Sequence, residues 1–244
     1  MALTDMALRQ RMFVALDVNT VAVARDLVDR LGNEVSAYKI GLELMFASGG
    51  DSGLDLAREL AETGKSVFLD MKLLDIPNTV ESATRNIADL GLGFLTIHGS
   101  DRKTLDAAVK GRAASKLKLL AVTVLTSLDA ADLAEQGIAG RTAADLVLDR
   151  ALRAKAAGFD GVIASGHEAT AVRNAVGPEF LIVTPGIRLP GDATGDQARV
   201  MTPGQAIAAG ASHLVIGRSI TAAADPSAAA RACLADIAAA REIA

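Results

Sequence analysis

The strongest constraint on the fold is the regular alternation of short apolar runs with longer helical segments along the chain. Between the runs, apolar residues recur at steps of three and four, as from Val80 to Leu90, which places them on one helix face. Such alternation predicts parallel strands with right-handed crossovers, and eight units can close into a barrel. The predicted strands are Phe13–Asp17, Val35–Ile40, Val67–Lys72, Phe94–His98, Leu119–Leu125, Gly161–Ser165, Phe180–Thr184 and His213–Gly217.

A weak internal repeat supports this pattern. Gly64, Gly91, Gly158 and Gly210 each end an alanine-rich helical segment and precede a strand, where glycine is the favoured residue after a helix. No linker or block of like charges divides the chain, so we predict an α/β protein with a single (β/α)8 TIM-barrel domain over residues 1–244. The longest irregular stretch, Gly186–Thr202, is expected to be a mobile active-site loop.

Composition narrows the functional classes. The net charge of −4 gives no basic footprint for nucleic acid or an anionic membrane surface, so an anionic ligand must be held by local charges. Cys233 is the only cysteine, and no Cys/His group has the spacing of a metal site. Neither a secretory signal nor an apolar run of about 18 residues is present, which predicts a cytoplasmic protein without a membrane segment.

Charged residues stand where several predicted strands end. Strands of a parallel barrel are nearly all apolar, and active sites lie at their C-terminal ends. Asp17 ends the first strand, Lys39 lies in the second, and Asp70 and Lys72 lie in the third. Alternation points Phe68, Asp70 and Lys72 to one side of that strand, whereas Val67, Leu69 and Met71 face the helices. The alternative for each charge is a structural ion pair that closes the top of the barrel.

A second group of residues predicts a phosphate site. The eighth strand runs into Gly217 and Arg218, and Arg188 follows the seventh strand. Backbone N–H groups beside a glycine and a forked guanidinium both suit phosphate, which barrels commonly bind at this place. The alternative is a glycine-containing turn with a surface arginine. His98, at the end of the fourth strand, is interpreted as a core histidine in preference to a pocket residue.

Residues Asp70–Thr79 resemble the signature of orotidine 5′-monophosphate decarboxylases. One departure is Leu74, where many members carry histidine. Further segments resemble that family in the same order, so the resemblance covers essentially the whole chain. They are Phe13–Asp17, Tyr38–Gly41, Thr123–Ser127, Thr184–Arg188, Gly195–Val200 and Val215–Arg218.

The resemblance implies a cofactor-free decarboxylase that makes UMP in de novo pyrimidine biosynthesis as a homodimer with shared active sites. It implies that Lys72, Asp70 and Asp75 are catalytic, with Lys72 as the proton donor and Asp75 supplied by the second subunit. The substrate-binding residues that it implies are Asp17 and Lys39 at the ribose, Ile76 and Thr79 from the partner, Thr126 and Ser127 at the pyrimidine, and Arg188, Gln197, Gly217 and Arg218 at the phosphate.

Two rival functions are kept. The first is a magnesium-dependent enzyme with a similar barrel, a keto-gulonate phosphate decarboxylase or a hexulose phosphate synthase, which resembles this chain in the third strand only. The second is a sensor that binds a phosphorylated ligand without catalysis, in which retained charges in a pocket would be costly. Consumption of orotidine monophosphate by purified protein distinguishes the decarboxylase from the sensor, and dependence on magnesium would indicate the sugar-phosphate enzyme.

Overall fold

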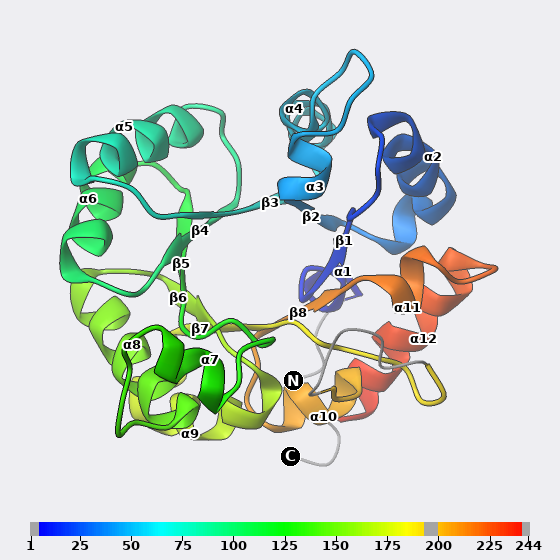
Figure 1. The fold of residues 1–244 in the computed structure, drawn as a ribbon. Coiled ribbons are helices and arrows are strands. Elements are labelled where there is room, and N and C mark those ends of the chain that lie inside the picture. The colour runs from blue at the N-terminus through cyan, green and yellow to red at the C-terminus, as the bar shows by residue number, and fades with distance from the viewer. Residues whose placement is uncertain (1–4, 193–199, 241–244) are drawn as a thin grey trace.

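The computed structural model describes residues 5–192 and 200–240, and within them eight parallel strands close into a barrel (Figure 1). Each strand pairs with the next along the chain, and β1 pairs with β8. The predicted barrel is therefore confirmed. The strands are β1 Met12–Ala15, β2 Ala37–Gly41, β3 Ser66–Leu73, β4 Phe94–His98, β5 Lys118–Val122, β6 Gly161–Ile163, β7 Leu181–Thr184 and β8 His213–Ile216.

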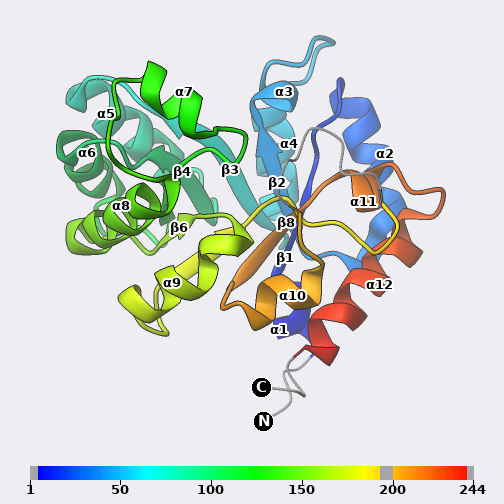
Figure 2. The same cartoon turned by 60° about the horizontal axis from the view of Figure 1, so that its bottom comes forward.

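Helices follow the strands and form the outer layer. In Figure 2, α3 and α7 stand at one end of the barrel and α1 lies at the other. The helices are α1 Asp5–Arg9, α2 Val21–Leu31, α3 Leu42–Met45, α4 Gly53–Glu62, α5 Pro77–Ala88, α6 Arg102–Arg112, α7 Ala130–Glu135, α8 Ala143–Ala157, α9 Gly166–Val176, α10 Pro203–Ala208, α11 Arg218–Thr221 and α12 Pro226–Ala239, with a 3-10 turn η1 at Gly32–Glu34. No helix in the described part of the chain has the length and apolar character to cross a membrane.

Local sequence accounts for the helix boundaries. Thr142 begins α8 with a capping box: its hydroxyl accepts from the Asp145 N–H, and the Asp145 carboxylate accepts from the Thr142 N–H. Gly158 ends the same helix in the left-handed conformation, which glycine adopts without a steric cost. The other three glycines of the predicted repeat also have positive φ, between 71° and 107°, so the repeat is confirmed as a set of helix ends.

Several strands end earlier than predicted. The first stops at Ala15, the fifth at Val122, the sixth at Ile163 and the eighth at Ile216. Asp17 therefore lies on the loop just beyond β1, and Arg218 begins α11 two residues after β8. The physical reason is that these side chains serve the barrel mouth, where the backbone leaves the sheet and turns toward a helix.

The aromatic residues close the barrel from the N-terminal end. Phe13, Phe68 and Phe94, three of only six phenylalanines, pack inside it with edge-to-face ring contacts. Phe13 and Phe68 have ring centroids 5.3 Å apart. This plug fills the lower interior, and the upper interior stays open to a ligand.

His213 packs against these phenylalanines, and its protonation makes the stability of the fold depend on pH. Its ring stacks on Phe13 at 5.7 Å, and its buried Nδ1 has no hydrogen-bond partner. Burial, and then the charges of Lys118 and Arg11, lower the pKa of His213 from 6.5 to about 4. Because the unfolded chain takes up a proton between these values and the folded chain does not, the stability from neutral His213 is complete above 6.5 and lost as pH falls toward 4.

We expect wild-type protein to lose about 2 kcal/mol more stability than His213→Leu between pH 7 and pH 4.5, because the variant cannot take up this proton. Urea unfolding of both proteins at the two pH values measures the difference. Equal losses would mean that His213 is protonated as readily in the folded chain as in the unfolded one.

Candidate active site

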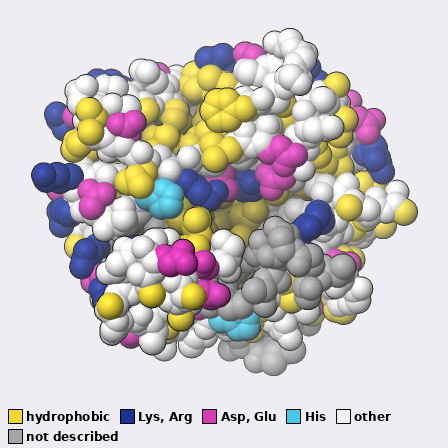
Figure 3. Space-filling view, in the orientation of Figure 1, with side chains coloured by type: hydrophobic (Ala, Val, Ile, Leu, Met, Phe, Trp, Pro, Cys, Tyr) yellow, Lys and Arg dark blue, Asp and Glu magenta, His cyan; other side chains and the backbone are white. Residues whose placement is uncertain are grey.

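A cavity of about 580 Å³ opens at the C-terminal end of the barrel. Its volume lies within the range of small-molecule sites. Figure 3 shows charged side chains gathered around a hollow at the centre of this face. Of the predicted site residues, Asp17, Lys39, Asp70, Lys72, Thr126, Arg188, Gly217 and Arg218 line the cavity.

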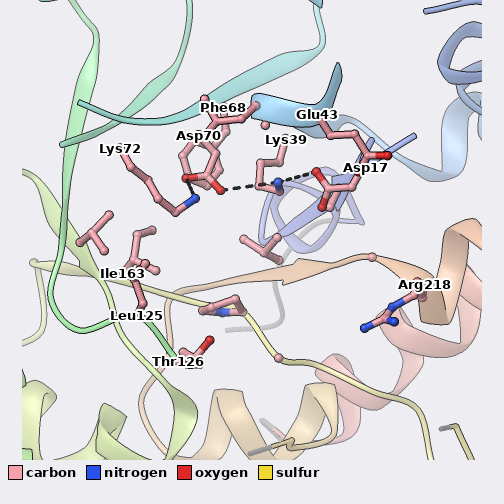
Figure 4. Close-up of a pocket in the computed structure, with 18 of the residues that line it drawn as sticks. Asp17, Lys39, Glu43, Phe68, Asp70, Lys72, Leu125, Thr126, Ile163 and Arg218 are labelled. Carbon is pink, nitrogen blue, oxygen red and sulfur yellow. Dashed lines mark hydrogen bonds and ion pairs between the residues drawn. The ribbon is translucent and has the colours of Figure 1, made fainter. Parts of the chain in front are cut away.

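Four charged side chains form a chain of alternating sign along one wall (Figure 4). Lys39 Nζ lies 2.8 Å from Asp17 Oδ1 and 3.5 Å from Asp70 Oδ2. Lys72 Nζ lies 2.8 Å from Asp70 Oδ1. The predicted convergence of these side chains from β2, β3 and the loop after β1 is therefore confirmed. We name the Asp17, Lys39, Asp70 and Lys72 side chains the charged chain.

The charged chain keeps the Asp70 carboxylate ionised. Burial by itself would raise the pKa of Asp70, but the charges of Lys39 and Lys72 and hydrogen bonds from Lys72 and Thr96 outweigh it and keep that pKa below its ordinary value. The Lys72 side chain remains 31% exposed toward the cavity, whereas that of Lys39 is only 8% exposed. Of the two lysines in the charged chain, Lys72 is therefore the one that a ligand can reach more readily.

Two arginines lie near each other on the phosphate side predicted from the sequence. In Figure 4, Arg218 lies across the cavity from Lys72. Arg188 is buried, and its Nη1 donates to the Ile187 carbonyl at 2.8 Å. Burial, and then the positive charge of Arg218, lower the pKa of Arg188. Two guanidinium groups that repel each other at one end of a cavity favour an anion between them.

A further set of predicted residues lies outside the cavity of this chain. Asp75, Ile76 and Thr79 follow β3 and are exposed, with Ile76 exposed by 68%. The Asp75 carboxylate accepts a hydrogen bond from the Ile76 N–H at 2.6 Å. Ser127 is exposed and does not line the cavity, although its neighbour Thr126 does. Gln197 lies outside the described residues.

The structure also adds residues that the sequence prediction missed. Thr96 on β4 is fully buried, and its hydroxyl bonds both Asp70 and the Lys72 backbone. At Gly41, an added Cβ would lie 2.9 Å from Lys39 Nζ, so a side chain there would displace the charged chain. The only available signal was a polar residue inside an apolar run, or a glycine at a strand end. His98 is partly buried and is not among the lining residues, so its role stays a prediction.

The side-chain directions predicted for β3 are confirmed, because Phe68, Asp70 and Lys72 line the cavity whereas Val67, Leu69 and Met71 pack in the surrounding core. The backbone beyond Leu69 is nevertheless irregular. Lys72 has a φ of 49°, and the register between β3 and β4 shifts between Leu69 and Leu73. Asp70 and Lys72 still reach the cavity together, but through an irregular segment and not through a straight strand. Contacts from the neighbouring strand, which no local pattern reports, hold this segment.

Fold and site together define the class: an eight-stranded α/β-barrel enzyme with a charged cavity for a small anionic ligand at its C-terminal end. Comparison with known proteins gives the family. The chain belongs to the orotidine 5′-phosphate decarboxylase / HUMPS family, whose model matches residues 10–233.

Relatives named orotidine 5′-phosphate decarboxylase match nearly the full chain. A Bradyrhizobium sp. protein is 54% identical over 97% of this chain and 95% of its own, and one from Rhodopseudomonas palustris is 52% identical over 99% of each. A crystal structure of orotidine 5′-phosphate decarboxylase from Lactobacillus acidophilus is similar, with a TM-score of 0.79 and 36% identity over 92% of this chain and 97% of its own.

Proposed function

We propose that this protein decarboxylates orotidine 5′-monophosphate to UMP in pyrimidine biosynthesis. The observation that carries the proposal is the charged chain facing two arginines across one cavity. The family description also includes HUMPS, so family membership alone does not choose the substrate. The full-length relatives named orotidine 5′-phosphate decarboxylase support this choice.

Substrate binding uses the two ends of the cavity. Arg188 and Arg218 hold the phosphate with charge-assisted hydrogen bonds, assisted by the Gly217 backbone and Gln197. Asp17 and Lys39 bind the ribose hydroxyls, and the pyrimidine lies beside Thr126 and Ser127. Phosphate contacts far from the reacting carbon supply binding energy that positions the ring against Lys72.

The chemistry takes place at C6 of the pyrimidine. Breaking the bond between C6 and the carboxylate releases CO2 and leaves the electron pair on C6. The Lys72 ammonium stabilises this negative charge and then transfers a proton to C6, which yields UMP. Neutral Lys72 regains a proton from solvent. Asp70, 2.8 Å from Lys72 Nζ, holds the lysine head group in place and puts a negative charge beside the substrate carboxylate.

The active site is completed by a second copy of this chain. Asp75, Ile76 and Thr79 do not line their own cavity and are exposed. Leu74 and Ile76 are large apolar side chains exposed by 57% and 68%, which favours burial against a partner. In an isologous dimer, each subunit would present this segment to the other subunit's cavity.

Consumption of orotidine monophosphate by the purified protein, followed by absorbance, tests the function. We expect turnover, and its absence would refute both the reaction and the roles assigned here. A sensor would bind the nucleotide without consuming it. We also keep the expectation of a cytoplasmic enzyme, which cell fractionation would test directly.

Turnover is expected to continue after exhaustive dialysis against EDTA, because Lys72 supplies the cation that stabilises the C6 charge. The assay compares dialysed protein with and without added magnesium. Activity lost in EDTA and restored by magnesium would favour the magnesium-dependent sugar-phosphate rival.

A further inference from the structure

The backbone at Lys72 has a conformation that lysine rarely adopts. Its φ is 49°, and Ala113 is the only other non-glycine residue in the described part of the chain with a positive φ. A side chain makes this region unfavourable, so such a conformation persists where the surroundings hold it. The lysine assigned to catalysis therefore needs a structural support.

The pairing of β3 with β4 shows why the strand cannot supply this support. Leu69 pairs with Leu95, and the next pair is Leu73 with Ile97, so four steps along β3 match only two along β4. Two extra residues therefore bulge out of the ladder between Leu69 and Leu73. Lys72 lies in this bulge, and its N–H donates to a side chain, the Thr96 hydroxyl, at 2.9 Å.

Thr96 joins the Lys72 backbone to the Asp70 carboxylate through one oxygen atom. Its Oγ1 accepts from the Lys72 N–H and donates to Asp70 Oδ1, both at 2.9 Å. The same Asp70 oxygen lies 2.8 Å from Lys72 Nζ. Thr96 is fully buried, so water does not compete for these bonds. The hydroxyl thus fixes the lysine backbone and the carboxylate that holds the lysine head group.

We propose that Thr96 is a positioning residue whose hydroxyl holds the left-handed backbone at Lys72 and orients Asp70, so that the Lys72 ammonium is aimed at the reacting carbon. This role rests on the proposed function. Thr96 bonds the Asp70 carboxylate and the Lys72 backbone and does not line the cavity, so it acts through these two residues. Its loss is expected to misplace the reacting groups and leave the phosphate contacts in place.

Two variants separate the hydroxyl from the methyl group of Thr96. Thr96→Val keeps the shape and removes the hydroxyl, whereas Thr96→Ser keeps the hydroxyl and removes the methyl. For Val, kcat should fall about 10- to 100-fold with KM within about threefold, because geometry is lost and substrate binding is kept. Ser should stay within about threefold of wild type. A packing role predicts the reverse order, with Ser the more damaged, and would overturn the proposal.

Thr104→Val is the matched control. Thr104 is also buried, and its hydroxyl donates to the Asp101 carboxylate at 2.8 Å at the start of α6, away from the cavity. The kcat of Thr104→Val should equal that of wild type. If Thr104→Val lost as much kcat as Thr96→Val, the Thr96 effect would be assigned to general destabilisation. If Thr96→Val does not fold, a comparison of Thr96→Ser with Thr96→Ala isolates the hydroxyl in the same way. Equal kcat values for these two variants would overturn the proposal.

A structural measurement keeps this test independent of the reaction. If wild-type protein does not consume orotidine monophosphate, the proposed function fails, whereas the positioning role is still read from crystal structures. In Thr96→Val we expect the Lys72 φ to leave the left-handed region or the contact between Lys72 and Asp70 to lengthen. An unchanged backbone and contact would show that Thr96 does not position Lys72.

Discussion

Homodimers of Lys72→Ala and of Asp75→Asn are each expected to lose about a thousandfold or more in kcat. The Lys72→Ala variant removes both the cation beside C6 and the proton donor, and each of these effects is large by itself. Asp75→Asn removes one negative charge from every site, and in the shared-site arrangement this is the charge that the partner supplies. Single-turnover kinetics with orotidine monophosphate measures both losses directly.

Mixing the two variants tests whether the site is shared. In a heterodimer, one cavity carries both substitutions and the other carries neither, so random exchange should restore activity at about a quarter of all sites. The exposed position of Asp75 makes this arrangement sterically feasible. The experiment needs co-refolding of equal amounts of the two chains and a tag that verifies heterodimer formation.

A mixture of Lys72→Ala with Lys72→Met is the control, because neither chain supplies a lysine and no pairing can rebuild a site. It should stay as inactive as its parents. If heterodimers of Lys72→Ala and Asp75→Asn form and remain as inactive as both parents, Asp75 acts within its own subunit and the shared site is wrong.

Arg218→Ala is expected to raise KM strongly and to lower kcat/KM. The loss in kcat/KM should correspond to about 2 to 4 kcal/mol of transition-state stabilisation, the value of a lost bidentate contact between guanidinium and phosphate. Arg218 lies across the cavity from Lys72, so its loss should act on binding before it acts on the proton transfer (Figure 4). Steady-state kinetics with the nucleotide gives both constants.

Two comparisons make the Arg218 result specific. Orotidine, which lacks the phosphate, should be processed equally slowly by wild type and Arg218→Ala, because the group that Arg218 would contact is absent from this substrate. Arg9→Ala removes an arginine from α1, at the opposite end of the barrel, and should leave kinetics unchanged. Unchanged kinetics of Arg218→Ala with the nucleotide would mean that the phosphate binds elsewhere.

Much of the fold was predictable because its determinants are local. Apolar runs, helical spacing and glycine at helix ends repeat along the chain, and each acts within about ten residues of sequence. Eight such units leave few closed arrangements, and the barrel is one of them. Asp17, Lys39, Asp70 and Lys72 were predictable for the same reason, because parallel strands bring their C-terminal ends to one rim.

The sequence by itself therefore determined the barrel and the rim on which charges gather. Tertiary structure alone decided how those charges meet. The left-handed backbone at Lys72 depends on Thr96 of the next strand, 24 residues away, and the proximity of Arg188 to Arg218 depends on the closure of β7 against β8. These contacts join residues distant in sequence, and a bulge or a hydrogen bond between strands leaves no periodic pattern in either strand alone.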